Sequence, residues 1–321
     1  MRETSLTEEP KPEGKKTPPA AMIGAGVAIG ASLLTVFITT SNRDDEKASP
    51  PAQAAAADPA EDQTAQIQFG QNGQTTPPPV PATPDPGAPV ANTDGSLAFA
   101  DDTISFSAAI PPGPATDPVL TYLRTDALAY FSKYKANARA DAERRKEEGA
   151  MAMPWEVLIE WAYTAKAGDI VSLTGTAYEF TGGAHGMTYT DTHIAKTDTG
   201  EQITIESMLQ SGGISPAITI GVCEALKRAK LEMGGTANIH GEPIVCAGVN
   251  ANISIEEAKF ALAPSTEANK FGGLFVYYDP YAVGAYAEGT YSLALPHEVF
   301  AEDLRPEYKA MFGGKVAAEP T

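Results

Sequence analysis

The sequence predicts an α+β fold in which an antiparallel sheet, a meander, is packed by two amphipathic helices. Three runs within residues 155–196 alternate apolar and polar side chains with the period of two that strands require. Two other segments start with a capping residue and a proline, Asp117 with Pro118 and Ser215 with Pro216, which is typical of helix starts. These strand-like and helix-like segments form separate blocks, and that segregation indicates the α+β class.

The strands of the meander are separated by tight turns rich in Gly and Asp. In the run that starts at Trp155, alternation predicts that Trp161 and Tyr163 are buried and that Thr164 faces water. The predicted strands cover residues 97–110, 155–165, 170–181 and 187–196.

Each predicted helix carries one apolar stripe. The first runs from Asp117 to Gly149, with charged last turns, and the second runs from Ser215 to Gly234. The stripe residues are Leu120, Leu123, Ala127, Phe131, Tyr134 and Ala138 in the first helix and Ile218, Val222, Ala225, Leu226 and Ala229 in the second. Further strands are expected at residues 259–263, 273–278 and 291–295, followed by a short helix at 296–304.

A glycine-histidine corner joins two strands of the meander. Gly182, Gly183 and Gly186 flank Ala184 and His185, and glycine permits positive φ or a close approach of another chain segment. We interpret His185 as a turn residue that is hydrogen-bonded to backbone. Gly182, Gly183 and His185 are candidate ligand-binding residues.

The two cysteines, Cys223 and Cys246, lie on either side of the end of the second helix. In an oxidising compartment, a disulfide across this segment stabilises by about 3 kcal/mol in the loop-entropy model. A buried free thiol at Cys223 is the alternative, and we predict the disulfide.

The first 96 residues predict no globular structure. Residues 20–40 are almost wholly apolar and match the roughly 20 residues that span a bilayer, so we expect a transmembrane helix instead of a cleaved signal peptide. Residues 1–19 are then a short cytoplasmic tail, and residues 41–96, rich in Pro and Ala, a disordered tether. Gly26 and Gly30 have a spacing that allows weak dimerisation of the span.

Charge bears on both topology and partners. Basic residues are denser before the apolar run than after it, which favours a single-pass protein of the inner membrane with residues 97–316 as a periplasmic, extracytoplasmic domain. The formal net charge is −18, and residues 97–321, with 17 basic and 29 acidic side chains, contribute −12. This balance argues against nucleic acid and fits either a cationic partner or merely solubility.

An aromatic loop, residues 279–289, is called the tyrosine loop below. Its Tyr281 and Tyr286 suit stacking on sugars or a protein interface, and its Asp279 and Glu288 suit cationic side chains of a ligand. We expect the glycine-histidine corner to brace this loop.

One constellation suggests chemistry. Asp191 and His193 share a face of a predicted strand and, with His185, are candidates for acid-base or metal chemistry. Zinc usually takes at least three protein ligands, and His240 and His297 lie in segments without metal-ligand spacing. Nucleophile-elbow, metalloprotease and phosphate-loop motifs are missing from the sequence. We expect no metal, no cofactor and no enzymatic activity.

Two separated signatures occur in order along the chain. The first consists of Tyr178 and residues 181–186 with Asp198, Gly200, Ile203, Thr204 and Leu209. The second consists of residues 277–281 with Gly284, Tyr286, Gly289 and Pro296. Together they resemble the extracytoplasmic domain of RsiV-type anti-sigma factors and the N-terminal module of PdaC-type peptidoglycan deacetylases, over about residues 97–310. The RsiV resemblance implies lysozyme binding and signalling by membrane proteolysis. Residues 1–19 are short for a sigma-factor-binding domain, which argues against anti-sigma activity, and no deacetylase domain follows.

We therefore expect a membrane-anchored, non-enzymatic recognition domain of the cell envelope that binds a cell-wall glycan or a lysozyme-like cationic protein. Two alternatives stay open. One is an envelope enzyme that acts on glycans through His185, Asp191 and His193, and the other is a structural spacer of the envelope.

Overall fold

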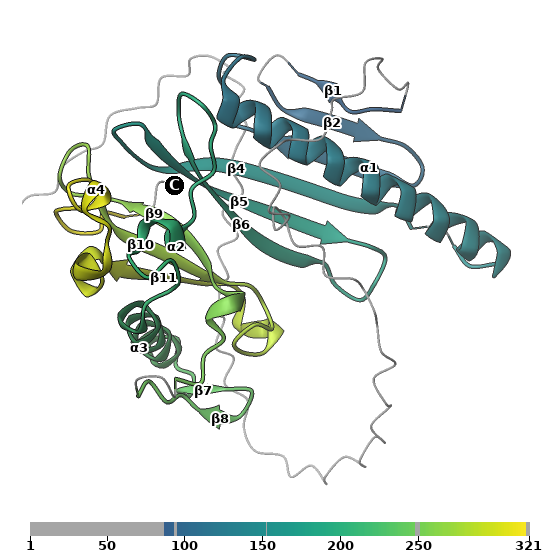
Figure 1. The fold of residues 1–321 in the computed structure, drawn as a ribbon. Helices are drawn as coiled ribbons and strands as arrows, with labels where there is room; N and C mark the ends of the chain where they lie inside the picture. Colours follow the sequence, from purple (N-terminus) through teal and green to yellow (C-terminus); the bar gives the residue numbers. More distant parts are fainter. Residues whose placement is uncertain (1–86, 93–94, 152, 248–250, 319–321) are drawn as a thin grey trace, which may run out of the picture. The chain divides into compact units, whose positions relative to one another are not determined.

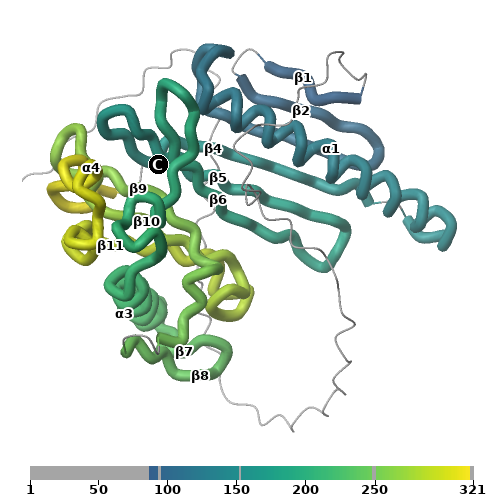
Figure 2. The backbone as a smooth tube through the Cα atoms, viewed as in Figure 1, coloured from purple at the N-terminus to yellow at the C-terminus, as the bar shows by residue number. Residues whose placement is uncertain are grey.

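The computed structural model describes residues 87–92, 95–151, 153–247 and 251–318, all within the unit Ala65–Thr321 (Figure 1). Its larger sheet has six strands in chain order. They are β1 (Val90–Ala91), β2 (Leu97–Ala100), β3 (Ile104–Ala109), β4 (Trp155–Ala167), β5 (Ile170–Phe180) and β6 (Met187–Lys196). Neighbouring strands are antiparallel except β3 and β4, which are parallel. The parallel pair requires a crossover, which the long helix α1 (Pro118–Glu147) provides, as the chain path in Figure 2 shows.

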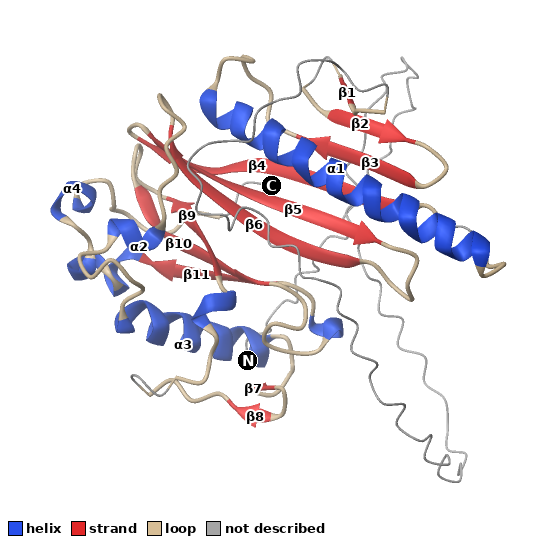
Figure 3. Cartoon of the chain, turned by 45° about the vertical axis from the view of Figure 1, so that its right-hand side comes forward, coloured by secondary structure: helices blue, strands red, loops and turns tan. Residues whose placement is uncertain are grey.

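Helix α1 covers one face of this sheet (Figure 3). Its N-cap is Asp117, whose Oδ1 accepts hydrogen bonds from the backbone N–H groups of Val119 (2.9 Å) and Leu120 (3.1 Å). All six stripe residues predicted for it are buried, and they pack with apolar side chains of β3, β4 and β5. The predicted helix and its buried face are therefore confirmed.

A three-stranded antiparallel sheet forms a second core with helix α3 (Pro216–Glu232). Its strands, in the order β11, β10, β9, are β9 (Lys259–Pro264), β10 (Phe271–Tyr278) and β11 (Tyr291–Pro296). Two short α-helices are α2 (Ile205–Met208) and α4 (Pro306–Lys309), and β7 (Asn238–Ile239) pairs with β8 (Glu242–Pro243) in a small ribbon. The mixed α+β architecture with mainly antiparallel sheets agrees with the sequence prediction.

The predicted disulfide between Cys223 and Cys246 is present. Cys223 is fully buried on α3, and Cys246 follows the β7–β8 ribbon. The bond therefore attaches the ribbon to the second core.

Strand β4 serves both cores because of a β-bulge. The β4–β5 register shifts between Tyr163 and Ala165, so residues after the bulge turn to the opposite face of the sheet. Ala165 and Ala167 accordingly join the second core, whereas Trp161 belongs to the α1 core. The prediction was wrong for Tyr163, which is 42% exposed, and for Thr164, which is only 4% exposed. Thr164 is buried because the second sheet covers its face: its hydroxyl lies 2.7 Å from that of Thr174, which lies 3.4 Å from the Tyr277 hydroxyl of β10.

Two other predicted elements differ in the structure. Residues 97–110 form two strands instead of one, because the Asp101 carboxylate accepts hydrogen bonds from the backbone N–H groups of Thr103 (2.8 Å) and Ile104 (3.0 Å) and fixes a turn. The helix predicted for residues 296–304 is replaced by two 3₁₀ turns, His297–Val299 and Ala301–Asp303.

The folded part also extends into the predicted tether, because β1 pairs with β2. The predicted span at residues 20–40 and its Gly26 and Gly30 lie outside the described residues, as does the predicted tail at 1–19. Within the part of the chain that the structure describes, none of the helices combines the length and apolar character needed to cross a membrane.

Candidate functional site

The tyrosine loop connects β10 to β11 and holds Tyr281 in an unusual conformation. Tyr281 has φ +73°, a left-handed conformation that a bulky side chain rarely adopts, and its side chain is 49% exposed. An exposed aromatic ring at a strained backbone position is a frequent mark of a functional site.

The glycine-histidine corner braces this loop, as the sequence indicated. The ring of Tyr286 stacks on the ring of His185, with 4.2 Å between centroids, and the Tyr286 hydroxyl donates to the Gly186 carbonyl oxygen (2.8 Å). His185 Nδ1 lies 3.0 Å from the same oxygen, which agrees with its interpretation as a turn residue bonded to backbone. Tyr281 in turn lies 5.5 Å from Tyr286, centroid to centroid.

The glycines of the corner have different reasons to be glycine. Gly182 has φ +83°, and a Cβ there would lie 2.8 Å from the guanidinium of Arg145. A Cβ on Gly186 would lie 2.4 Å from the ring of Tyr178. Gly183 is exposed and has no such restriction. Backbone conformation and close packing thus account for Gly182 and Gly186.

The two acidic residues of the loop are engaged within the chain. The Asp279 carboxylate accepts a hydrogen bond from the backbone N–H of Thr190 (2.7 Å), which fastens the start of the loop to β6. The Glu288 carboxylate accepts from Lys230 Nζ and from the Tyr291 hydroxyl, each at 2.6 Å, and fastens its end to α3. Their predicted contacts with a ligand stay predictions, and both carboxylates already have internal partners.

Glu288 is held as a carboxylate. Burial opposes ionisation, but the hydrogen bonds from Lys230, Tyr291 and the Ala285 N–H, together with the charge of Lys230, lower the pKa of Glu288 to about 2. Lys230 is 2% exposed and has its Nζ 5.0 Å from the centre of the Tyr291 ring. The Glu288 carboxylate is thus the counter-charge of the buried Lys230 ammonium group.

We expect Glu288→Gln to lower the free energy of unfolding at pH 7 by about 2 kcal/mol, because Lys230 loses its counter-charge while buried. The figure lies below the usual cost of breaking a buried pair because Glu288 is partly exposed. Chemical denaturation checks it. The double variant with Lys230→Met should recover part of the loss, and equal losses in the single and double variants would contradict this explanation.

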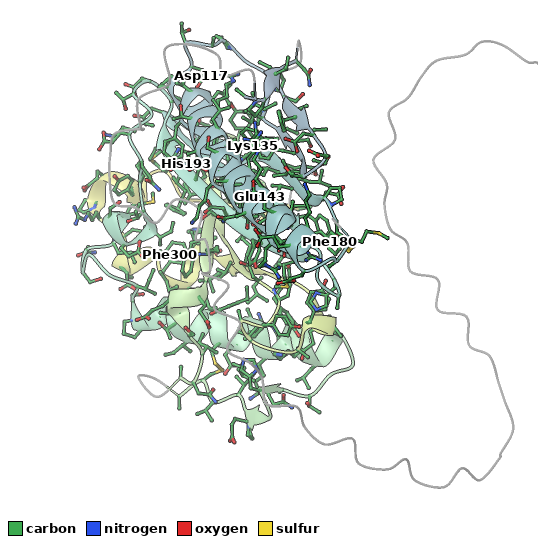
Figure 4. The ribbon with its side chains drawn as sticks, turned by 90° about the vertical axis from the view of Figure 1, so that its right-hand side faces the viewer. Asp117, Lys135, Glu143, Phe180, His193 and Phe300 are labelled. Carbon is green, nitrogen blue, oxygen red and sulfur yellow. A yellow bond between two sulfur atoms is a disulfide. The ribbon has the colours of Figure 1, made fainter. Side chains whose placement is uncertain are left out.

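A second feature is a cavity of about 220 Å³, called the β6-edge cavity. It forms where α1, α2 and β9 approach the outer strand of the larger sheet, and Figure 4 shows His193 beside α1. The lining side chains that carry polar chemistry are Tyr122, Asp126, Asp191, His193, Glu206 and Lys259.

The cavity lies at a gap in the covering of β6. The backbone N–H of Thr190 donates to Asp279, and the backbone carbonyl of Ile194 accepts from the N–H of Ile203 (2.8 Å). Between these points, the N–H of Thr192 donates to the Asp191 carboxylate (2.7 Å). At this point the Asp191 side chain, and not another strand of the described part of the chain, accepts the hydrogen bond from the β6 backbone. The cavity lies beside it.

Burial shifts the pKa values of three groups in this cavity. It raises the pKa of Asp126 to about 6 and, with the nearby charges of Asp126 and Asp279 adding to it, that of Asp191 to about 7. Burial lowers the pKa of His193 to about 4, so that the imidazole is neutral at pH 7. The Nε2 atom of His193 is buried and has no hydrogen-bond partner among the described residues.

The three residues of the enzymatic alternative do not share a site. Asp191 and His193 line the cavity, but His185 lies before β6 and stacks on Tyr286. At ~3.3 Å per strand residue, the start of β6 at Met187 and His193 are about 20 Å apart. In the described ranges, no three His, Cys, Asp or Glu side chains are grouped so as to hold a metal ion.

Sequence reasoning missed Asp126, Glu206 and Lys259. Asp126 carried the one available signal, because it is an acidic residue within the apolar stripe of α1, between Leu123 and Ala127. Glu206 and Lys259 come from elements distant in the chain, and their placement depends on tertiary packing.

Residues 97–188 match the family model described as Deacetylase PdaC. This segment contains β2 to β5, α1 and the glycine-histidine corner, and it ends within β6, before Asp191 and the tyrosine loop. No curated protein matches the chain.

Solved structures of two bacterial proteins are similar to the chain. A DUF3298 family protein from Pseudomonas aeruginosa is 19% identical with a TM-score of 0.38, and the match covers 54% of this chain and 71% of that one. A DUF3298 family member from Bacteroides fragilis is 15% identical with a TM-score of 0.39, over 63% of this chain and 83% of that one. The similarity that bears on family is thus the match of residues 97–188 to the PdaC model.

Proposed function

We propose that the described domain is a non-enzymatic recognition module of the cell envelope that binds its ligand through the tyrosine loop. The observation that carries the proposal is Tyr281, an exposed ring at φ +73° supported by Tyr286 and the corner. A strained aromatic residue on a braced loop presents a rigid apolar contact, which binds with little loss of conformational entropy. The proposed anchor, residues 20–40, would hold the module at the inner membrane with the domain outside it.

The ligand in this proposal is a lysozyme-like cationic protein or a cell-wall glycan. The net charge of −12 for residues 97–321 favours association with a basic protein. The resemblance to RsiV-type domains supports lysozyme as the first ligand to test, and the match to the PdaC model supports a role at the envelope.

We expect Tyr281→Asn to weaken lysozyme binding by about 2 kcal/mol or more, the range of an interface hot spot. Asparagine tolerates positive φ, so this variant removes the ring and preserves the backbone conformation. Calorimetry at about 50 mM and about 300 mM salt measures the loss and separates it from screened, long-range attraction. Tyr163→Ala, which removes another exposed tyrosine, is the matched control.

Two results would count against lysozyme. Binding that vanishes at the higher salt, with no effect of Tyr281→Asn at the lower, would show electrostatic attraction alone. Binding of soluble peptidoglycan fragments that depends on Tyr281, without lysozyme binding, would assign the loop to a glycan instead.

A further inference from the structure

We propose that the β6-edge cavity binds one small organic cation, an ammonium or guanidinium group, through Asp126, Asp191 and His193. No residue of the tyrosine loop lines the cavity, and the proposal does not depend on the function proposed for that loop.

The cavity presents hydrogen-bond acceptors. His193 is 2% exposed, its Nε2 has no partner among the described residues, and its ring is fixed by stacking on Tyr122 at 4.3 Å. With the proton on Nδ1, the Nε2 atom accepts a hydrogen bond, as do the carboxylates of Asp126 and Asp191. Ammonium and guanidinium groups carry donors and no acceptor, so they complement this set, and they would satisfy a buried nitrogen that is otherwise costly.

The charged side chains that line the cavity favour a cation. Three carboxyl groups, those of Asp126, Asp191 and Glu206, line the cavity together with one ammonium group, that of Lys259. Asp279, bonded to Thr190 beside Asp191, adds a further negative charge nearby. A cation entering this space reduces the repulsion among the carboxylates.

Size and aromatic walls limit the ligand to a small group. The volume of about 220 Å³ is below the roughly 300–1,000 Å³ of sites for drug-sized ligands. Tyr122, Trp161 and Phe260 contribute aromatic rings to the lining, and the faces of such rings attract cations.

Ionisation of the carboxyl groups in the lining makes the affinity for a cation depend on pH. The pKa values of about 6 for Asp126 and about 7 for Asp191 mean that both carboxyls gain charge between pH 5 and pH 8. The other titratable or charged groups around them are Tyr122 on α1, His193 on β6, Glu206 on α2, Lys259 on β9 and Asp279 after β10. His193 is already neutral above pH 5, since its pKa is about 4. Cation affinity should therefore rise across this range.

The test is binding of methylguanidinium to the purified full chain, measured by calorimetry and by the imidazole NMR signals of His193. We expect saturable binding that tightens about tenfold or more from pH 5.5 to pH 8, because the carboxylates ionise. Asp126→Asn and Asp191→Asn should each weaken it by about tenfold or more. N-methylurea, which has a similar shape and no charge, should bind at least about tenfold more weakly.

Two control variants change residues outside the cavity and should leave cation binding unchanged. Glu179→Gln changes another carboxyl whose pKa is raised by burial, to about 7, but which lies outside the cavity, and it should leave binding unchanged. Tyr281→Asn should also leave it unchanged, because Tyr281 does not line the cavity.

The outcomes are distinct. Equal binding of methylguanidinium and N-methylurea would overturn the proposal, as would no saturable binding up to about 50 mM, which is weaker than a specific site gives. Binding without a shift of the His193 signals would place the cation elsewhere and also overturn it. If blocked arginine amide binds as well as methylguanidinium, the cation is a basic side chain of a protein or peptide, and binding of methylguanidinium alone assigns it to a free small molecule.

Discussion

Asp191→Asn is expected to raise the free energy of unfolding at pH 8 by about 2 kcal/mol. Burial raises the pKa of Asp191 from 3.8 to about 7, so its ionised form costs stability in the folded state. A three-unit shift corresponds to about 4 kcal/mol, and we halve it because Asp191 is partly exposed and coupled to Asp126. The asparagine oxygen can still accept the hydrogen bond from the Thr192 N–H.

The sign of this effect gives a specific pH profile. A carboxyl whose folded-state pKa is raised favours folding below its unfolded pKa, and that contribution is lost as pH rises through the folded pKa. The gain from Asp191→Asn should therefore be absent near pH 3.8, grow as pH rises, and level off above about pH 7. Denaturation of both proteins at several pH values measures it, with the exposed Asp198→Asn as the control. A gain of equal size at pH 4 and pH 8 would contradict the burial explanation.

The result also bears on function. A residue whose replacement stabilises the fold is explained poorly by a structural role, and natural proteins retain such costs mainly at functional sites. If Asp191→Asn stabilises the fold and also abolishes cation binding, the stability that the ionised Asp191 costs would be explained by its role in binding the cation.

Cys246→Ser is expected to lower the free energy of unfolding by about 3 kcal/mol and Tm by roughly 10 °C. The disulfide closes a loop with a sequence separation of 23 residues, and removing it gives that conformational freedom back to the unfolded chain. We choose Cys246 because Cys223 is fully buried, and serine there would add an unsatisfied hydroxyl to the core. Thermal unfolding followed by circular dichroism measures the change.

Part of this loss should be local. The β7–β8 ribbon and the segment after it contact the second core mainly through Ile244 and Ile253, which are both buried. Hydrogen exchange in residues 236–253 should therefore increase more than in α1, whose core is separate. Treatment of the wild-type protein with a reductant should reproduce the variant, and an unchanged Tm after complete reduction would contradict a stabilising role.

Sequence signals predicted the structure correctly where the interactions involve residues that are close together in the chain. Asp117 with Pro118 and Ser215 with Pro216 start helices because a side-chain oxygen and a fixed φ act within one turn. The stripe of α1 follows from the period of the helix. The bounds of β6 agree with the strand predicted at residues 187–196, although burial does not alternate along it. The disulfide was predictable because Cys223 and Cys246 are the only cysteines and are close in sequence.

Long-range pairing could not be predicted in the same way. The parallel β3–β4 pair depends on α1 returning the chain across the sheet, and the bulge after Tyr163 depends on two cores competing for one strand. Alternation continues smoothly through Tyr163 and Thr164 in the sequence, so it contained no sign that the faces exchange.

The sequence by itself determined the α+β class, both main helices, the disulfide, and the glycine-histidine corner between β5 and β6. Each of these depends on residues near one another in the chain or on glycine at a restricted backbone position. Only the tertiary structure decided that Glu288 pairs with the buried Lys230, that His185 stands apart from His193, and that Asp126 joins Asp191 in a cavity. The reason is that burial and charge depend on which distant elements meet, and periodicity along a chain fixes the faces of an element but not its neighbours.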